Sequence, residues 1–145
     1  LRAKLKYLDD WSQRRQAIAS TYLTKLQGAE LVLPFVPDWA QPVWHLFVVR
    51  SSVRSELQQH LNQAGIGTLI HYPIPPHMQA AYAAAGYHAD SFPLAKLLAE
   101  QVLSLPIGPN QTEAQTNEVV YSIGLYSAGS EGGALALAGG ALSSK

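Results

Sequence analysis

The most informative stretch of the sequence is Ile66-Gly67-Thr68-Leu69-Ile70-His71-Tyr72-Pro73-Ile74-Pro75-Pro76-His77-Met78-Gln79. Its first part, residues 66–71, is mainly apolar and rich in β-branched side chains, which predicts a strand. The prolines that follow fix their own backbone angles and disfavour helix in the residue before each, so they predict a stiff loop. Two histidines, a tyrosine and a glutamine therefore lie where a rigid loop leaves a strand, a place where proteins commonly carry binding groups.

The segments on either side of this stretch alternate between helical and extended patterns. Residues 1–26 and 53–64 show apolar residues at helical spacing, and residues 43–49 form a short apolar run typical of a buried strand. Further along, the pattern predicts a short helix over residues 79–85, a longer helix over 93–103, an extended piece over 105–108 and a final helix over 112–126. The sum is an α+β fold, with a short and mostly antiparallel sheet of about three strands packed with helices.

The apolar faces of three of these helices are the candidate core. They consist of Leu1, Leu5, Leu8, Ile18, Tyr22 and Leu26 in the first helix, Val53, Leu57, Leu61 and Ala64 in the second, and Val119, Val120, Ile123 and Tyr126 in the last. Gly28 and Gly65 follow the first two helices and are expected to end them, because glycine accepts the left-handed cap conformation.

Both ends of the sequence differ from its middle. Because helical spacing begins at Leu1, we expect the chain to start partway through a larger protein. Residues 127–145 are mostly Gly, Ala and Ser, and their apolar stretch falls short of the roughly 20 residues that span a bilayer. We therefore predict one domain over residues 1–126, followed by a flexible tail over residues 127–145.

The charge balance argues against several classes of protein. The 145 residues include ten Lys and Arg against ten Asp and Glu, and charged residues make up 14% of the chain. Because a typical domain has about 25%, this surface is poor in charge, and a neutral chain suits neither nucleic acid nor a basic membrane-surface patch. The absence of cysteine excludes disulfides and Cys-ligated zinc. No signal pattern opens the sequence, and we expect a cytoplasmic protein.

The histidines of the proline-rich stretch leave three interpretations open. A metal site would use His71 and His77 with His88 or Asp90, although their spacing matches no standard zinc pattern. A rim that recognises a polar ligand would use histidine and tyrosine for hydrogen bonds and stacking. The third interpretation is a structural strand exit packed on its neighbours. The sequence contains no complete catalytic constellation, and Ser104 lies in no nucleophile-elbow pattern.

Four segments of the sequence, taken in order, share a resemblance to one family. They are Leu5-Lys6-Tyr7-Leu8-Asp9-Asp10-Trp11 followed by Arg14, Arg15, Ile18, Ala19 and Tyr22, then His45-Leu46-Phe47-Val48-Val49-Arg50, then residues 65–68 and 71–79 with Tyr82, and finally Leu103-Ser104-Leu105-Pro106-Ile107-Gly108-Pro109. They resemble the C-terminal part of DegT/DnrJ/StrS-type nucleotide-sugar aminotransferases, and the third is similar to that family's most recognisable C-terminal motif. The resemblance covers residues 1–126.

The resemblance implies the small C-terminal domain of an enzyme with the fold type I architecture of aspartate aminotransferase. Such enzymes depend on pyridoxal phosphate and are usually homodimers. An amino acid, typically glutamate, supplies the amino group, which the enzyme moves to a keto group on a nucleotide-linked sugar. His71, Tyr72, Pro75 and His77 match the region implicated in contacts with the sugar, so they are the expected substrate-binding residues.

The same resemblance implies that the cofactor is bound outside this chain, by a large domain that is missing here. A lysine of that domain holds the cofactor as a Schiff base, and none of Lys4, Lys6, Lys25, Lys96 and Lys145 matches it. We therefore expect no catalytic, cofactor-binding or metal-binding residue in this chain, and no activity from the chain alone. The alternative is a binding or interaction module derived from that domain, without catalysis.

Overall fold

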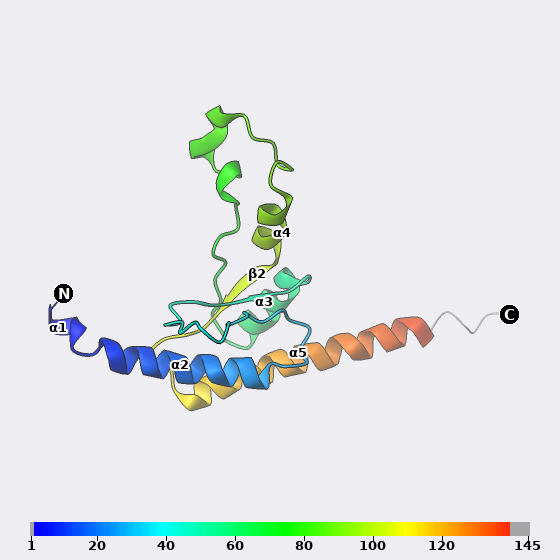
Figure 1. Ribbon diagram of the computed structural model, residues 1–145. Helices are drawn as coiled ribbons and strands as arrows, with labels where there is room; N and C mark the ends of the chain where they lie inside the picture. The colour runs from blue at the N-terminus through cyan, green and yellow to red at the C-terminus, as the bar shows by residue number, and fades with distance from the viewer. Residues whose placement is uncertain (1, 140–145) are drawn as a thin grey trace.

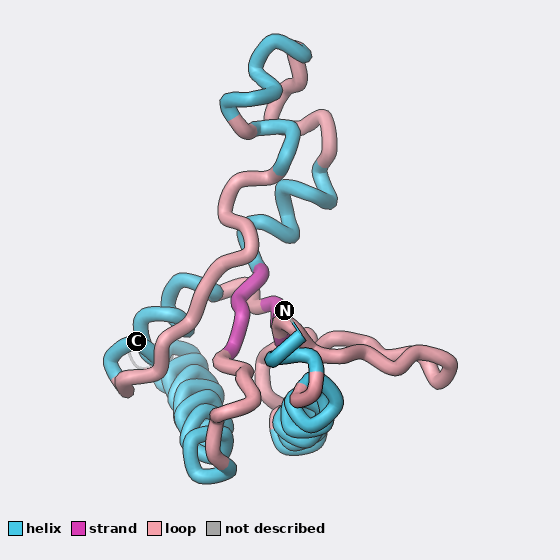
Figure 2. The backbone as a smooth tube through the Cα atoms, turned by 90° about the vertical axis from the view of Figure 1, so that its left-hand side faces the viewer, coloured by secondary structure: helices cyan, strands magenta, loops and turns pink. Residues whose placement is uncertain are grey.

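The computed structural model describes residues 2–139, which form a layer of helices, a small sheet and a projecting arm (Figure 1). The elements in chain order are α1 (Arg2–Leu5), α2 (Leu8–Lys25), β1 (Phe47–Arg50), α3 (Arg54–Gln63), the 3-10 helices η1 (Pro76–Met78) and η2 (Ala80–Ala85), α4 (Pro93–Gln101), β2 (Val102–Leu105) and α5 (Glu113–Gly139). Helices α2 and α5 lie below the sheet in this view, and the arm projects upward from the end of the sheet at which α4 runs into β2 (Figure 2). The predicted α+β class is confirmed.

The sheet has two antiparallel strands, in which Phe47 pairs with Leu105 and Val48 with Ser104. Each outer edge carries one isolated bridge, from Val32 to Arg50 beside β1 and from Leu69 to Ser104 beside β2. The expectation of about three strands is therefore slightly wrong, because residues 66–71 pair at a single position. Gly67 has a low strand propensity, and Pro73 has no N–H to donate, so the pairing does not extend on either side.

The boundary between α4 and β2 also differs from the prediction. The helix ends at Gln101 rather than at residue 103, and the strand occupies residues 102–105 rather than 105–108. Val102 is already extended, with φ −69° and ψ 138°. The strand ends at Leu105 because Pro106 cannot donate a hydrogen bond to the neighbouring strand.

The core lies between the sheet and the three helices α2, α3 and α5. One face of the sheet contributes Phe47, Val49, Leu103 and Leu105, all at most 3% exposed. The helices contribute Ile18, Ala19, Tyr22, Leu57, Leu61, Val119 and Ile123. The predicted helix faces are confirmed at all of these positions except Ala19, which is not among the predicted core residues. Val53 at the start of α3 is 37% exposed, and Ala64 at its end is exposed as well. Gly28 and Gly65 both adopt the left-handed conformation, with φ of 85° and 76°.

The first predicted helix is interrupted near its beginning. A turn at Lys6 and Tyr7 separates α1 from α2. Leu5 and Leu8 are 55% and 48% exposed, whereas Ile18 and later apolar residues of the same pattern are buried. The predicted helical spacing is correct, but only the apolar residues in the second half of this segment pack into the core of this chain.

The arm, defined as residues 72–98, contains η1, η2 and the first part of α4. None of its residues is buried. Its exposed large apolar side chains are Tyr72, Ile74, Met78, Tyr82, Tyr87, Phe92, Leu94 and Leu97. Because hydrophobic stabilisation scales with the apolar area removed from water, the arm gains little of it from the rest of this chain.

Helix α5 is longer than predicted. It packs against α2 and α3 and continues to Gly139, beyond the helix end expected at Tyr126. The expected tail therefore coincides with helix over residues 127–139, where alanines and leucines favour the helix, and residues 140–145 lie outside the described part of the chain. The division into a domain and a flexible tail stays a prediction. None of the described helices is both long and apolar enough to cross a membrane.

Candidate functional site

Three of the four predicted substrate-binding residues lie together at the base of the arm. His71, Tyr72 and Pro75 line one cavity of about 330 Å³, between the proline-rich loop and α4. Tyr72 is 70% exposed, and its ring meets the His71 ring edge-on with the centroids 5.5 Å apart. The loop therefore presents an imidazole and a phenol side by side, both able to hydrogen-bond a polar ligand.

His71 is held by a residue of the sheet. Its Nδ1 atom lies 2.8 Å from Oγ of Ser104, a side chain that is 5% exposed. Phe47 and Leu105 face the core, so the paired residues Val48 and Ser104, one position along each strand, face the opposite side of the sheet. The candidate site is thus on the sheet face that α2 and α5 leave open.

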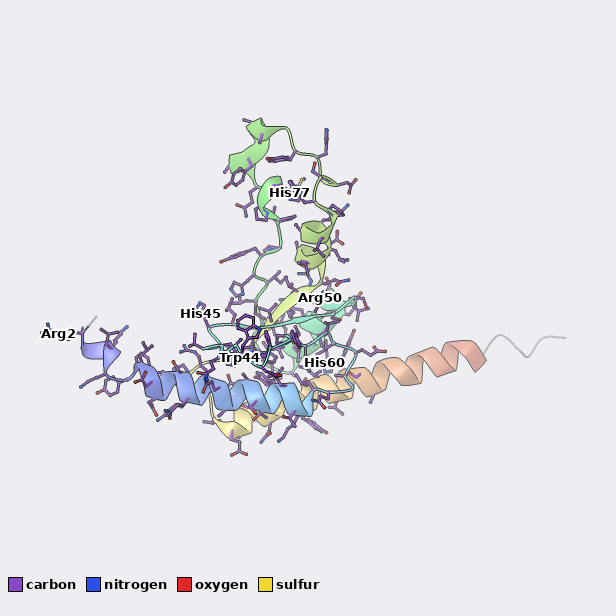
Figure 3. All side chains as sticks on the ribbon, viewed as in Figure 1. Arg2, Trp44, His45, Arg50, His60 and His77 are labelled. Carbon is purple, nitrogen blue, oxygen red and sulfur yellow. The ribbon has the colours of Figure 1, made fainter. Side chains whose placement is uncertain are left out.

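A second cavity meets the first at His71. It has a volume of about 240 Å³, and its lining includes His45, Leu69 and Ser104. His45 lies two residues before β1 and follows Trp44, which has a positive φ of 52°. Figure 3 shows both residues at the sheet, away from the arm.

His77 lies apart from the other predicted residues, higher in the arm (Figure 3). Its Nε2 atom is 3.3 Å from the carbonyl oxygen of Ala89, and its ring packs edge-on against Phe92 at 5.0 Å. It lines a neighbouring cavity of about 320 Å³ with Tyr82 and Tyr87. The structure therefore assigns His77 to an aromatic cluster of the arm rather than to the cavity of His71.

The metal interpretation finds no support in the described residues, where no three His, Asp or Glu side chains gather. His71 and His77 have the separate partners given above. Asp90 pairs with Lys96, whose Nζ lies 2.8 Å from Oδ1. The hydrogen bond and the charge of Lys96 hold the pKa of Asp90 below its ordinary value of 3.8.

The residues of the candidate site do not fit a Schiff-base cofactor. Among the described lysines, none lines either cavity at His71. Lys25 donates to Oδ1 of Asn117 at 2.7 Å, and Lys96 is occupied by Asp90. Lys145 lies outside the described residues. What the site offers is hydrogen-bonding and aromatic surface, which is suited to recognising a ligand.

Sequence reasoning missed two groups of residues at this site. The partnership of Ser104 with His71 joins positions 33 residues apart, so no local pattern signals it. The rings around His77 come from Tyr82, Tyr87 and Phe92. Their clustering could have been suspected from the aromatic residues that follow the proline-rich stretch.

Comparisons with known proteins identify the family to which this chain is related. Residues 1–124 match the DegT/DnrJ/EryC1/StrS aminotransferase family. The erythromycin biosynthesis sensory transduction protein EryC1 of Saccharopolyspora erythraea is 47% identical over 124 residues, which is 85% of this chain and 34% of that protein. The dTDP-3-amino-3,4,6-trideoxy-alpha-D-glucose transaminase of Streptomyces venezuelae is 45% identical over 85% of this chain and 33% of its own length.

Solved structures give the same result. The crystal structure of S. venezuelae DesV in complex with a ketimine intermediate has a TM-score of 0.84 at 43% identity, over 87% of this chain and 34% of that chain. A DegT/DnrJ/EryC1/StrS aminotransferase from Brucella abortus has a TM-score of 0.80 at 28% identity, over 88% and 34% of the two chains. The chain thus spans about a third of the length of the relatives that it matches. On the match over residues 1–124 and these likenesses, the chain belongs to the DegT/DnrJ/EryC1/StrS aminotransferase family.

Proposed function

We propose that this chain is the C-terminal, substrate-side part of a pyridoxal-phosphate-dependent aminotransferase. The whole enzyme moves an amino group from an amino acid, typically glutamate, to a keto group on a nucleotide-linked sugar. The lysine that binds the cofactor belongs to another part of the longer protein, and this chain alone is inactive. His71, Tyr72 and Pro75 contact the sugar substrate at the base of the arm, and His77 contributes from the arm itself.

The observation that carries the proposal is the 45% identity with a dTDP-sugar transaminase over 85% of the chain. The geometry supports it, because His71, Tyr72 and Pro75 of the most distinctive motif line one cavity. Sugars are recognised mainly through their hydroxyl groups, and an imidazole beside a phenol supplies both hydrogen-bond donors and acceptors. The absence of lysine from the lining of this cavity agrees with a cofactor bound elsewhere.

The proposal extends to the partners of this chain. We infer that the longer protein is a cytoplasmic homodimer that binds neither nucleic acid nor membrane. The exposed aromatic side chains favour such an assembly, since Phe35 and Trp39 are 86% and 87% exposed and the arm has no buried residue. Exposed apolar surface of this extent is typical of protein contacts.

The test uses the longer protein that carries this chain, purified with pyridoxal phosphate. Its two half-reactions are measured separately, the first by the cofactor absorbance after adding glutamate and the second by amination of a dTDP-linked keto sugar. Tyr72→Phe removes one hydroxyl, so we expect kcat/KM for the sugar to fall about tenfold. His77→Ala should also weaken the sugar half-reaction, and both variants should leave the glutamate half-reaction nearly unchanged.

Tyr121→Phe is the matched control, because Tyr121 is 67% exposed on α5 and lines neither cavity of the site. Equal losses in both half-reactions would show that the loop has a structural role. A cofactor-loaded protein that aminates no nucleotide-linked sugar would favour the non-catalytic module instead. Mixed with pyridoxal phosphate, this chain alone should give no lysine-dependent absorbance, and a stoichiometric signal lost on replacing one lysine would refute the inactivity.

A further inference from the structure

Ser104 holds the position of His71 through both its backbone and its side chain. The Ser104 amide donates to the Leu69 carbonyl at 2.8 Å, and the Leu69 amide donates to the Ser104 carbonyl at 3.3 Å. Residues opposite each other in an antiparallel pair place their side chains on one face, and the residue two positions along shares that face. The pairing therefore directs His71 toward Ser104, and the 2.8 Å contact between Nδ1 and Oγ completes the arrangement.

The direction of this hydrogen bond follows from what each alternative leaves unpaired. A serine hydroxyl and an imidazole Nδ1 can each donate to the other. If Nδ1–H donates, the hydroxyl hydrogen of the buried Ser104 needs a second acceptor, and among the described residues the hydroxyl has no other hydrogen-bond partner. A buried donor without a partner costs more free energy than a spare acceptor lone pair. The favoured arrangement therefore has the Ser104 hydroxyl donating to Nδ1.

We propose that Ser104 is a positioning residue that fixes His71 in the tautomer protonated at Nε2. His71 then offers a hydrogen-bond donor where its two cavities meet. A donor at this point selects an acceptor oxygen of the ligand, such as a hydroxyl, carbonyl or phosphoryl oxygen. Because Nε2 already carries the proton of the neutral ring, His71 cannot accept another proton from the ligand through this atom. The statement about the ligand rests on the proposed function, because a nucleotide-linked sugar supplies such oxygens. The statement about the tautomer does not depend on the proposed function.

The tautomer is tested on this chain by long-range ¹H–¹⁵N NMR of the histidine rings. The spectra are recorded over a series of pH values, and the ring ¹⁵N shifts themselves identify the spectra in which His71 is neutral. We expect His71 to carry its proton on Nε2, with an unprotonated Nδ1 shifted by the bond from Ser104. In Ser104→Ala this Nδ1 signal should move toward that of the exposed His88, and Ser104→Thr, which keeps a hydroxyl, should preserve the original signal.

Ser52→Ala removes an exposed serine and is the control for the serine-to-alanine change. A His71 ring protonated at Nδ1 in the unmodified chain would overturn the proposed direction of the bond. His71 signals that stay unchanged in Ser104→Ala would overturn the positioning role. Circular dichroism shows whether each variant folds. If Ser104→Ala does not fold, the spectrum of the unmodified chain still shows which ring nitrogen of His71 carries the proton.

The ligand part is tested in the longer protein. Loss of the positioning bond in Ser104→Ala should raise the KM for a dTDP-linked keto sugar about three- to tenfold, with little change in kcat or in the glutamate half-reaction. Ser104→Thr should restore the KM. An unchanged KM in Ser104→Ala would overturn the role of His71 as a fixed donor. A protein that aminates no sugar would contradict the proposed function, while the NMR result would still stand or fall by itself.

Discussion

Replacing Tyr22 by phenylalanine should lower the free energy of unfolding by about 1–2 kcal/mol at neutral pH. The residue is fully buried, and its hydroxyl donates to the Pro106 carbonyl at 2.8 Å and accepts from Gln111 Nε2 at 3.0 Å. Gln111 keeps its bond to Thr116 Oγ1 at 3.1 Å, so the main loss is the donor to the Pro106 carbonyl. The ring contact with Phe47, at 5.0 Å between centroids, is preserved in the variant.

The same residue makes stability depend on alkaline pH. Burial raises the pKa of Tyr22 from 10.0 to about 12, while the hydrogen bond from Gln111 opposes this rise. Because the folded pKa exceeds the unfolded one, the neutral phenol contributes its full stabilisation below pH 10, and this contribution is lost as pH rises from 10 to about 12. A shift of about two units corresponds to about 3 kcal/mol at most. The stability gap between the unmodified chain and Tyr22→Phe should therefore close over this range.

The assay is urea unfolding followed by circular dichroism, from neutral pH to about pH 12. Tyr121→Phe is the control, because Tyr121 is 67% exposed, and its unfolding free energy should change by less than about 0.5 kcal/mol. Equal stability of the unmodified chain and Tyr22→Phe at neutral pH would refute the role of the two hydrogen bonds. A gap that stays constant through the alkaline range would refute the raised pKa.

Two further substitutions test the core and the arm. Leu61→Ala removes a fully buried side chain of α3 and should lower the free energy of unfolding in urea by about 2–5 kcal/mol. Leu125→Ala, at a position that is 52% exposed, is the control. A loss of stability in Leu61→Ala no larger than that in Leu125→Ala would contradict the assigned core. Lys96→Ala should raise the pKa of Asp90 toward 3.8, because the 2.8 Å bond from Lys96 holds it below that value. The carboxyl ¹³C shift through an acid titration measures this pKa, and an unchanged midpoint would show that the ion pair does not form in solution.

The sequence was sufficient for the fold where one helix carries a continuous apolar face. Leu57 and Leu61 on α3, like Val119 and Ile123 on α5, are buried as their four-residue spacing predicts. The strands were harder to place. The mainly apolar residues 102–105 suit either the end of α4 or a strand, and only their pairing with β1, more than fifty positions earlier, selects the strand. Local pattern does not contain such a contact.

The candidate site likewise contains contacts that the sequence predicts and contacts that it does not. His71, Tyr72 and Pro75 share a cavity because a proline-rich loop keeps neighbours in sequence close in space. His77 departs from them, because its contacts are with Ala89 and Phe92 on the returning half of the arm. The metal interpretation requires the two histidines to converge, whereas each has a separate hydrogen-bond partner and no three possible ligands gather among the described residues.

The low charge of the sequence and the exposed aromatic residues of the structure have a common explanation. The core takes up one face of the sheet and the inner sides of three helices, which accounts for most of the buried apolar residues. Eight of the exposed large apolar side chains lie on the arm, and Phe35 and Trp39 are 86% and 87% exposed. Scattered apolar residues are normal on any surface, but a whole arm without one buried residue is not. We infer that these surfaces contact protein in the proposed longer enzyme, and that charged side chains are few because such contacts exclude them at their centre.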